Sequence, residues 1–195
     1  MLNRSTGAVL ALILGGCSRP EAVTGGGPGE FHASVTGAVA AEYRGSGGFH
    51  FGGGDSPYMG IELRAGPGAT DDRISLAAPG RSSPPGVGTY RVASSAGDPH
   101  PAASAPVFEV VFTRDAAGIH ETYAADRGEV VFQVSSPGQV KGTFWFEAAK
   151  VCARPVVGNP ARGCSPDWID PGSPRIRVRG SFEAVRDRPE EWMPA

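Results

Sequence analysis

The feature that most limits the fold of this chain is an alternation of apolar and polar residues along short segments. It is clearest at Phe31–Thr36, Val140–Ala148 and Arg175–Arg179. Side chains of a β-strand point to opposite faces in turn, so a period of two predicts strands. No segment shows the capped, amphipathic pattern of a helix. Further strands are expected at residues 58–64, 73–76, 89–92, 107–113, 119–123 and 129–134, and residues 181–184 are expected to extend the strand at 175–179.

Glycine and proline separate these segments, with 29 glycines and 18 prolines among 195 residues. Because they fall between strand patterns, they indicate turns rather than disorder. About nine or ten strands without helices predict an all-β fold, a single antiparallel β-sandwich or barrel. The domain is expected at residues 30–185, with a short C-terminal tail at residues 186–195.

The N-terminal residues have the pattern of an export signal. One basic residue, Arg4, precedes an apolar run from Ala8 to Leu14, and two glycines and Cys17 follow. A membrane-spanning helix needs about 20 apolar residues, so this shorter run predicts a cleaved signal. The Gly-rich stretch at residues 17–29 is expected to act as a flexible tether.

The tetrapeptide Leu14-Gly15-Gly16-Cys17 resembles the lipobox of bacterial lipoproteins. The resemblance implies that residues 1–16 are removed as a signal peptide. It also implies that Cys17 carries a diacylglyceryl group and a further acyl chain such as palmitate, which together anchor the protein to a membrane. Ser18 follows the cysteine, where an aspartate in this family signals inner-membrane retention. The resemblance therefore implies the outer membrane of the bacterial cell envelope. The alternative is an ordinary secretory peptide whose cysteine is coincidental.

A second resemblance rests on short motifs in roughly the last 100 residues: Gly88-Thr89-Tyr90, Gly128-Glu129-Val130, the segment 140–146 and the segment 178–182. Their order resembles uncharacterised all-β lipoproteins of the Gram-negative envelope. The resemblance implies an all-β fold and carries over no catalytic residue. The glycines in these strands are expected where neighbouring backbone or a large ring packs closely.

Cys152 and Cys164 remain as an even pair after Cys17 is assigned to the lipid. In an exported chain such a pair predicts a disulfide. A metal pair is the alternative, but no further Cys or His lies close in sequence to complete four ligands.

Charge excludes one class of partner. The chain has 18 basic and 20 acidic side chains, a net charge of −2, so no nucleic acid partner is expected. The expected partners are the membrane, through the acyl chains, and an envelope protein or a glycan.

No catalytic, cofactor-binding or metal site is predicted. The four histidines have no metal-binding spacing and are expected on surfaces or in loops. The segment Gly53–Pro57 superficially resembles a serine-hydrolase block and is interpreted as a turn, since no helix supports that chemistry. Two acidic pairs are interpreted as solvated loop carboxylates, which lack the ligand density of a calcium loop. The histidines are His32, His50, His100 and His120, and the acidic pairs are Asp71 with Asp72 and Asp167 with Asp170.

Two features remain as candidates for binding. Trp145 is out of phase with Phe144 and Phe146, so it should face away from the core, whereas Trp168 is expected to pack on the disulfide loop. Arg175, Arg177 and Arg179 line one face of a strand. They are expected to be solvated or paired with Glu129, Glu147 or Glu183 on neighbouring strands, and a functional alternative is an anion-binding or docking face.

The sequence therefore favours a non-enzymatic, lipid-anchored envelope protein that acts as a binding or structural module. One alternative is a carrier of a small molecule or glycan with a cavity between sheets. The other is a hydrolase whose site assembles from distant strands.

Overall fold

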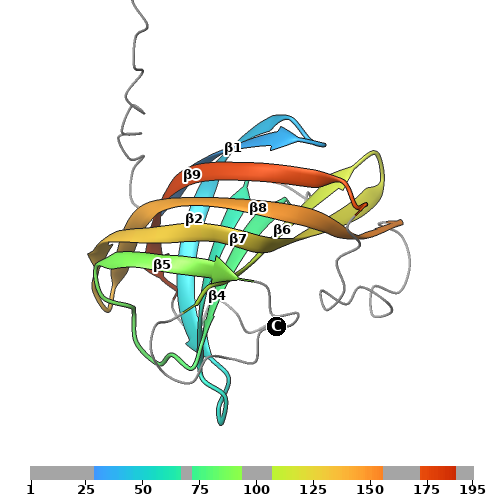
Figure 1. The fold of residues 1–195 in the computed structure, drawn as a ribbon. Coiled ribbons are helices and arrows are strands. Elements are labelled where there is room, and N and C mark those ends of the chain that lie inside the picture. Colours follow the sequence, from blue (N-terminus) through green and yellow to red (C-terminus); the bar gives the residue numbers. More distant parts are fainter. Residues whose placement is uncertain (1–28, 67–71, 94–106, 156–171, 188–195) are drawn as a thin grey trace, which may run out of the picture.

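The computed structural model describes residues 29–66, 72–93, 107–155 and 172–187, with the backbone alone at 152–155. These residues form nine strands and no helix, which confirms the predicted all-β class (Figure 1). None of the described segments is a helix with the length and hydropathy to cross a membrane. The strands are β1 (Glu30–Gly37), β2 (Ala41–Gly52), β3 (Tyr58–Ala65), β4 (Arg73–Pro79), β5 (Gly88–Ala93), β6 (Glu109–Ala116), β7 (Ile119–Ser135), β8 (Gln139–Pro155) and β9 (Arg175–Arg186).

Eight of the strands close into a barrel, which decides between the sandwich and the barrel that the sequence left open. The pairing runs β7–β6–β4–β3–β2–β1–β9–β8, and β8 pairs again with β7. All these neighbours are antiparallel. β5 is the extra strand and pairs with the second half of β7, beyond the part that pairs with β6. Beyond the first residue of β1, β2 and β9 make a short parallel contact at Gly48 and Phe49.

The structure corrects two strand predictions. β2 was not predicted, because Gly45, Gly47 and Gly48 interrupt its apolar pattern. Residues 119–123 and 129–134 belong to one strand, since irregular pairing between Ala125 and Arg127 lets β7 continue past a polar stretch. Residues 175–179 and 181–184 form the single strand β9, as the sequence predicts.

Apolar side chains fill the barrel interior. Phe132 lies at their centre, with its ring centroid 5.8 Å from Phe182, 5.5 Å from Phe108 and 5.6 Å from Tyr90. An eight-stranded barrel has about the width at which side chains can occupy the whole lumen. Phe144 and Phe146 are buried in the same core, as their alternate positions predict.

Glycines let these rings approach the wall, as the sequence predicts. A Cβ at Gly180 would lie 2.5 Å from the Phe144 ring and 2.4 Å from the His32 carbonyl oxygen. At Gly142, between Phe132 and Phe182, a Cβ would lie 2.0 Å from the Val131 carbonyl oxygen. Close packing of rings over backbone therefore depends on the missing side chain at both positions.

The barrel has two different ends. β1 begins and β9 ends at one of them, here called the proximal end, next to the β7–β8 turn, where the Arg186 amide donates to the Gly138 carbonyl. The opposite, distal end holds the β1–β2 and β6–β7 turns. Both ends of the described chain therefore leave the barrel on the same side.

Candidate functional site

The distal end carries an inward-facing polar group of residues, here called the distal cluster: Tyr43, Arg114, Glu121, Tyr123 and Lys150. Arg114 lies opposite Glu121 in the β6–β7 hairpin, and Tyr123 lies opposite Lys150 across β7 and β8. Tyr123 is buried in the core. Next to it lie the charged side chains of Glu121 and Lys150, so the apolar interior ends at this level of the barrel.

Glu121 is the centre of the distal cluster. Its Oε2 accepts hydrogen bonds from Arg114 Nε at 2.7 Å and from the Tyr123 hydroxyl at 3.2 Å. Its Oε1 accepts from Lys150 Nζ at 2.6 Å. The Glu121 side chain is 12% exposed, so one largely buried carboxylate bridges two cations.

Electrostatics keep the distal cluster charged. Burial alone would raise the pKa of Glu121, but hydrogen bonds from Lys150 and Arg114 outweigh it and lower that pKa. Burial raises the pKa of Tyr43 and of Tyr123. At neutral pH the carboxylate is therefore ionised between two cations and beside neutral hydroxyls. This arrangement ties β6, β7 and β8 together at the barrel end.

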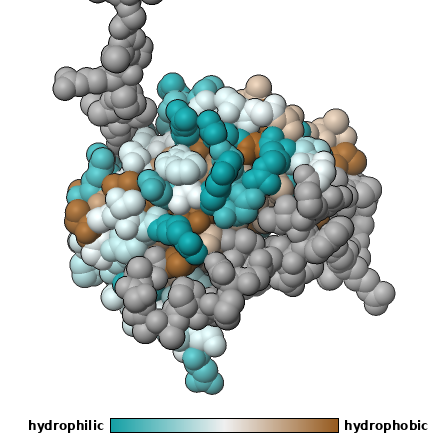
Figure 2. Space-filling view, in the orientation of Figure 1, coloured by the Kyte–Doolittle hydropathy of each residue, from teal (hydrophilic) through white to brown (hydrophobic). Residues whose placement is uncertain are grey.

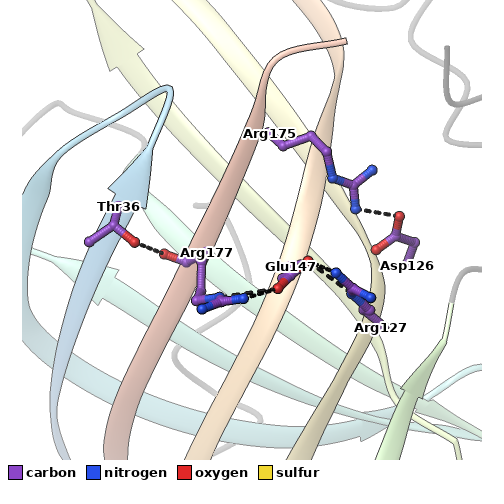
Figure 3. A network of polar contacts seen from close by, with 6 residues as sticks. All are labelled: Thr36, Asp126, Arg127, Glu147, Arg175 and Arg177. Atoms are coloured by element: carbon purple, nitrogen blue, oxygen red, sulfur yellow. Dashed lines mark hydrogen bonds and ion pairs between the residues drawn. The ribbon is translucent and has the colours of Figure 1, made fainter. Parts of the chain in front are cut away.

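A second group lies on the outside of the wall formed by β7, β8 and β9. Arg127, Glu147 and Arg177 face one another across the three strands (Figure 3). Trp145 lies opposite Arg179 in the next row. With Arg175 these residues form what we call the arginine face. Trp145 is on the opposite side of β8 from Phe144 and Phe146, which are buried in the core.

Glu147 organises the arginine face. Its Oε2 accepts hydrogen bonds from Nε of Arg127 at 2.8 Å and from Nη2 of the same residue. Its Oε1 accepts from Nε of Arg177 at 3.1 Å and from Nη2. Arg177 and then Arg127, through these hydrogen bonds, lower the pKa of Glu147 to about 2. Arg175 pairs with Asp126 at 2.5 Å.

The two guanidinium groups that bind Glu147 are more exposed to solvent than its carboxylate. The Glu147 side chain is 12% exposed, against 66% for Arg127 and 51% for Arg177. Hydrophilic side chains gather over the wall where β8 and β9 run (Figure 2). The predicted pairing of the β9 arginines with neighbouring acids is confirmed for Arg177 and Glu147.

The histidines do not come together. His32 Nε2 lies 2.9 Å from Glu42 on the outer wall, and His120 Nδ1 lies 2.7 Å from Asp115. His50 is in strand β2 rather than in a loop, with its ring 5.7 Å from Tyr58. Within the described part of the chain, no three His, Cys, Asp or Glu residues are placed to hold a metal ion. His100 lies outside that part.

The other sequence-based candidates have mixed outcomes. Gly53–Pro57 is the predicted turn, in which Gly53 has φ 99° and its carbonyl accepts from the Ser56 amide at 2.7 Å. Asp72 is not simply solvated, since it accepts the Asp115 amide at 2.7 Å. Cys17, Asp71, Cys164, Asp167, Trp168, Asp170 and the side chain of Cys152 lie outside the described residues, so lipid attachment and the disulfide stay predictions.

Sequence reasoning missed the distal cluster. One signal was present: Arg114 and Glu121 stand symmetrically about the turn at Ala117 and Gly118, so a hairpin there brings them face to face. The contact of Lys150 with Glu121 lies far from the β7–β8 turn, beyond register shifts in that hairpin that no local pattern indicates.

Comparisons of the chain with models of known protein families, with curated proteins and with solved structures find no match.

Proposed function

We propose that this protein is an envelope lipoprotein, held by acyl chains on Cys17, that works as a non-enzymatic binding or structural module. The observation that supports this most is the contrast between the inside and the outside of the barrel. The lumen is occupied by the protein's own aromatic rings, whereas the outer wall holds a set of oriented charges. Contacts with other molecules would then form on the wall.

The placement of the chain ends is compatible with an anchor. β1 begins at the proximal end, so a tether from Cys17 joins the barrel there. The wall of β7, β8 and β9 runs along the barrel between the two ends. A barrel hung from its proximal end would present this wall and the distal end to the envelope.

The filled interior also bears on the alternative of a small-molecule carrier. Ligand sites of that kind are mostly apolar cavities with a few polar groups. Here the rings of Phe108, Phe132 and Phe182 meet inside the barrel. This supports a module that binds through its surface over one that stores a ligand in the lumen.

The test is fractionation of the full-length protein and its Cys17→Ser variant, expressed in a bacterium with an outer membrane. The wild type should be found in the outer-membrane fraction, and Cys17→Ser should move to the soluble fraction with its fold intact, as judged by circular dichroism. If wild type and Cys17→Ser were distributed in the same way between the membrane and soluble fractions, the lipid anchor would be refuted.

A further inference from the structure

We propose that the arginine face binds an anionic polysaccharide, a linear chain of sugars that carry carboxylate or phosphate groups. This inference rests on the proposed function as a binding module and names the class of partner. Three features of the arginine face support it: its charge, the spacing of its cations and the position of Trp145.

Charge comes first. Arg127, Arg175, Arg177 and Arg179 stand against Asp126, Glu129 and Glu147, so the face is positive on a chain whose net charge is negative. Glu147 lies beneath Arg127 and Arg177, so four guanidinium groups share the exposed face with one exposed carboxylate, that of Glu129. Each of these arginines uses Nε and Nη2 for Glu147, and the other N–H groups of the guanidinium remain as outward donors. Carboxylate and phosphate oxygens are the acceptors that such donors fit best.

The cations on β9 are regularly spaced. Arg175, Arg177 and Arg179 occupy alternate positions of β9, so they form a straight row with about 6.7 Å between neighbours. Glu147 fixes the middle cation of this row. A regular row of cations complements a polymer with regularly repeated anions better than a single small anion.

Trp145 supplies a surface for the sugar ring. It lies directly opposite Arg179 on β8, and its Nε1 donates to Glu129 Oε2 at 3.2 Å, which orients the indole. Directly opposed residues have Cβ atoms about 5 Å apart. A sugar whose C–H face lies on the indole would therefore hold its anionic group within reach of Arg179.

The face suits a glycan better than a lipid surface or a protein. A membrane-surface contact buries an apolar face, and the core of a protein interface is more apolar than its rim. The large exposed hydrophobic residues among the described ones are elsewhere, near strand ends and turns: Tyr58, Val87, Ile119, Val134 and Val185.

Isothermal titration calorimetry tests the inference with the full-length protein in a non-ionic detergent at low salt. The probe is oligogalacturonate, a linear chain of sugar carboxylates, and neutral dextran of similar length is the reference. Arg179→Gln removes one cation of the row. Arg64→Gln makes the same charge change at an exposed position of β3, outside the arginine face. Trp145→Thr removes the indole.

We expect wild type to bind oligogalacturonate and not dextran. Arg179→Gln and Trp145→Thr should each weaken binding at least about fivefold, while Arg64→Gln should stay within about twofold of wild type. Thermal melts of all variants check that the fold is kept. A Trp145→Thr variant that melts early is replaced by Trp145→Phe, which should bind with intermediate affinity.

Three results would overturn the inference: no binding of oligogalacturonate, equal losses in Arg179→Gln and Arg64→Gln, or polyglutamate binding as tightly as the sugar polymer with no effect of Trp145→Thr. Tighter binding to vesicles that contain phosphatidylglycerol than to the polymer would also overturn it, in favour of a lipid headgroup. Each of these results leaves the anchor at Cys17 untouched, because that is tested by fractionation and not by titration.

Discussion

Glu121 is the residue whose removal should affect the barrel most through charge alone. Glu121→Gln leaves Arg114 and Lys150 facing each other at the end of the core without the carboxylate between them. Breaking a largely buried ion pair typically costs about 3–5 kcal/mol, and we expect the free energy of unfolding to fall by about 3 kcal/mol. Urea denaturation at neutral pH measures it. A loss below about 1 kcal/mol, the range of surface ion pairs, would contradict the bridging role.

Glu147 should make stability depend on pH in the acid range. Its pKa is lowered from 4.5 to about 2, so the native state favours the ionised form. The stabilisation is complete above the ordinary value and is lost as the pH falls from about 4.5 towards about 2. In thermal melts over this range Glu147→Gln should lose less stability than the wild type.

Glu109→Gln on β6 makes the same charge change away from the arginine face. Its melting temperature should follow the wild-type dependence on pH. If Glu147→Gln and Glu109→Gln had the same pH profile, the two arginines would not be holding the charge of Glu147.

The sequence predicts single residues well where a strand has one buried face. The outward orientation of Trp145 follows from alternation. The sequence left Glu129, Glu147 and Glu183 as possible partners of the β9 arginines, and the register of β8 with β9 selects Glu147 for Arg177. The bridge from Glu121 to Lys150 does not follow, because the two residues are far apart in the chain and meet only across the β7–β8 pairing.

At the scale of elements, replacing the glycines of β8 and β9 with larger residues should destabilise the barrel. Gly180→Ala places a methyl group 2.5 Å from the Phe144 ring and 2.4 Å from a backbone oxygen. Overpacking of this kind costs about 1–3 kcal/mol, and we expect about 2 kcal/mol from chemical denaturation.

Gly138→Ala is the matched control, since a Cβ at Gly138 meets nothing within 4 Å. It should change the free energy of unfolding by less than about 0.5 kcal/mol. Equal losses in the two variants would mean that the cost comes from the loss of glycine itself and not from the ring packed over Gly180.

Elements were predicted most clearly where apolar and polar residues alternate, as in β1, the first half of β8 and the first half of β9. β2 was missed because its glycines leave no side chains to form a pattern, although the structure needs Gly45 for its close approach to the Arg64 carbonyl. β7 was divided into two because its middle is polar and irregularly paired. A local sequence pattern identifies a strand by its buried side chains. It therefore does not detect strands in which glycines bury the backbone instead.

At the scale of the whole molecule, closure of the barrel is a property that the sequence did not decide. A sandwich and a barrel need the same alternating strands, and the unbroken ring of strand pairings, which β7 and β8 complete, separates them here. Hydrogen exchange measures that pairing. Amides at residues 142–147 and 127–132 should be protected as strongly as those of β2 and β3, because both sets lie inside ladders. Fast exchange confined to the β7–β8 ladder would indicate an open sheet.

Native mass spectrometry of protein extracted from membranes tests the lipid anchor and the filled lumen of the barrel together. We predict a chain that begins at Cys17, with a mass increased by fatty acyl groups and with no small molecule retained inside the barrel. A chain with residues 1–16 intact and no acyl groups, or a barrel that keeps one equivalent of a small molecule, would contradict it.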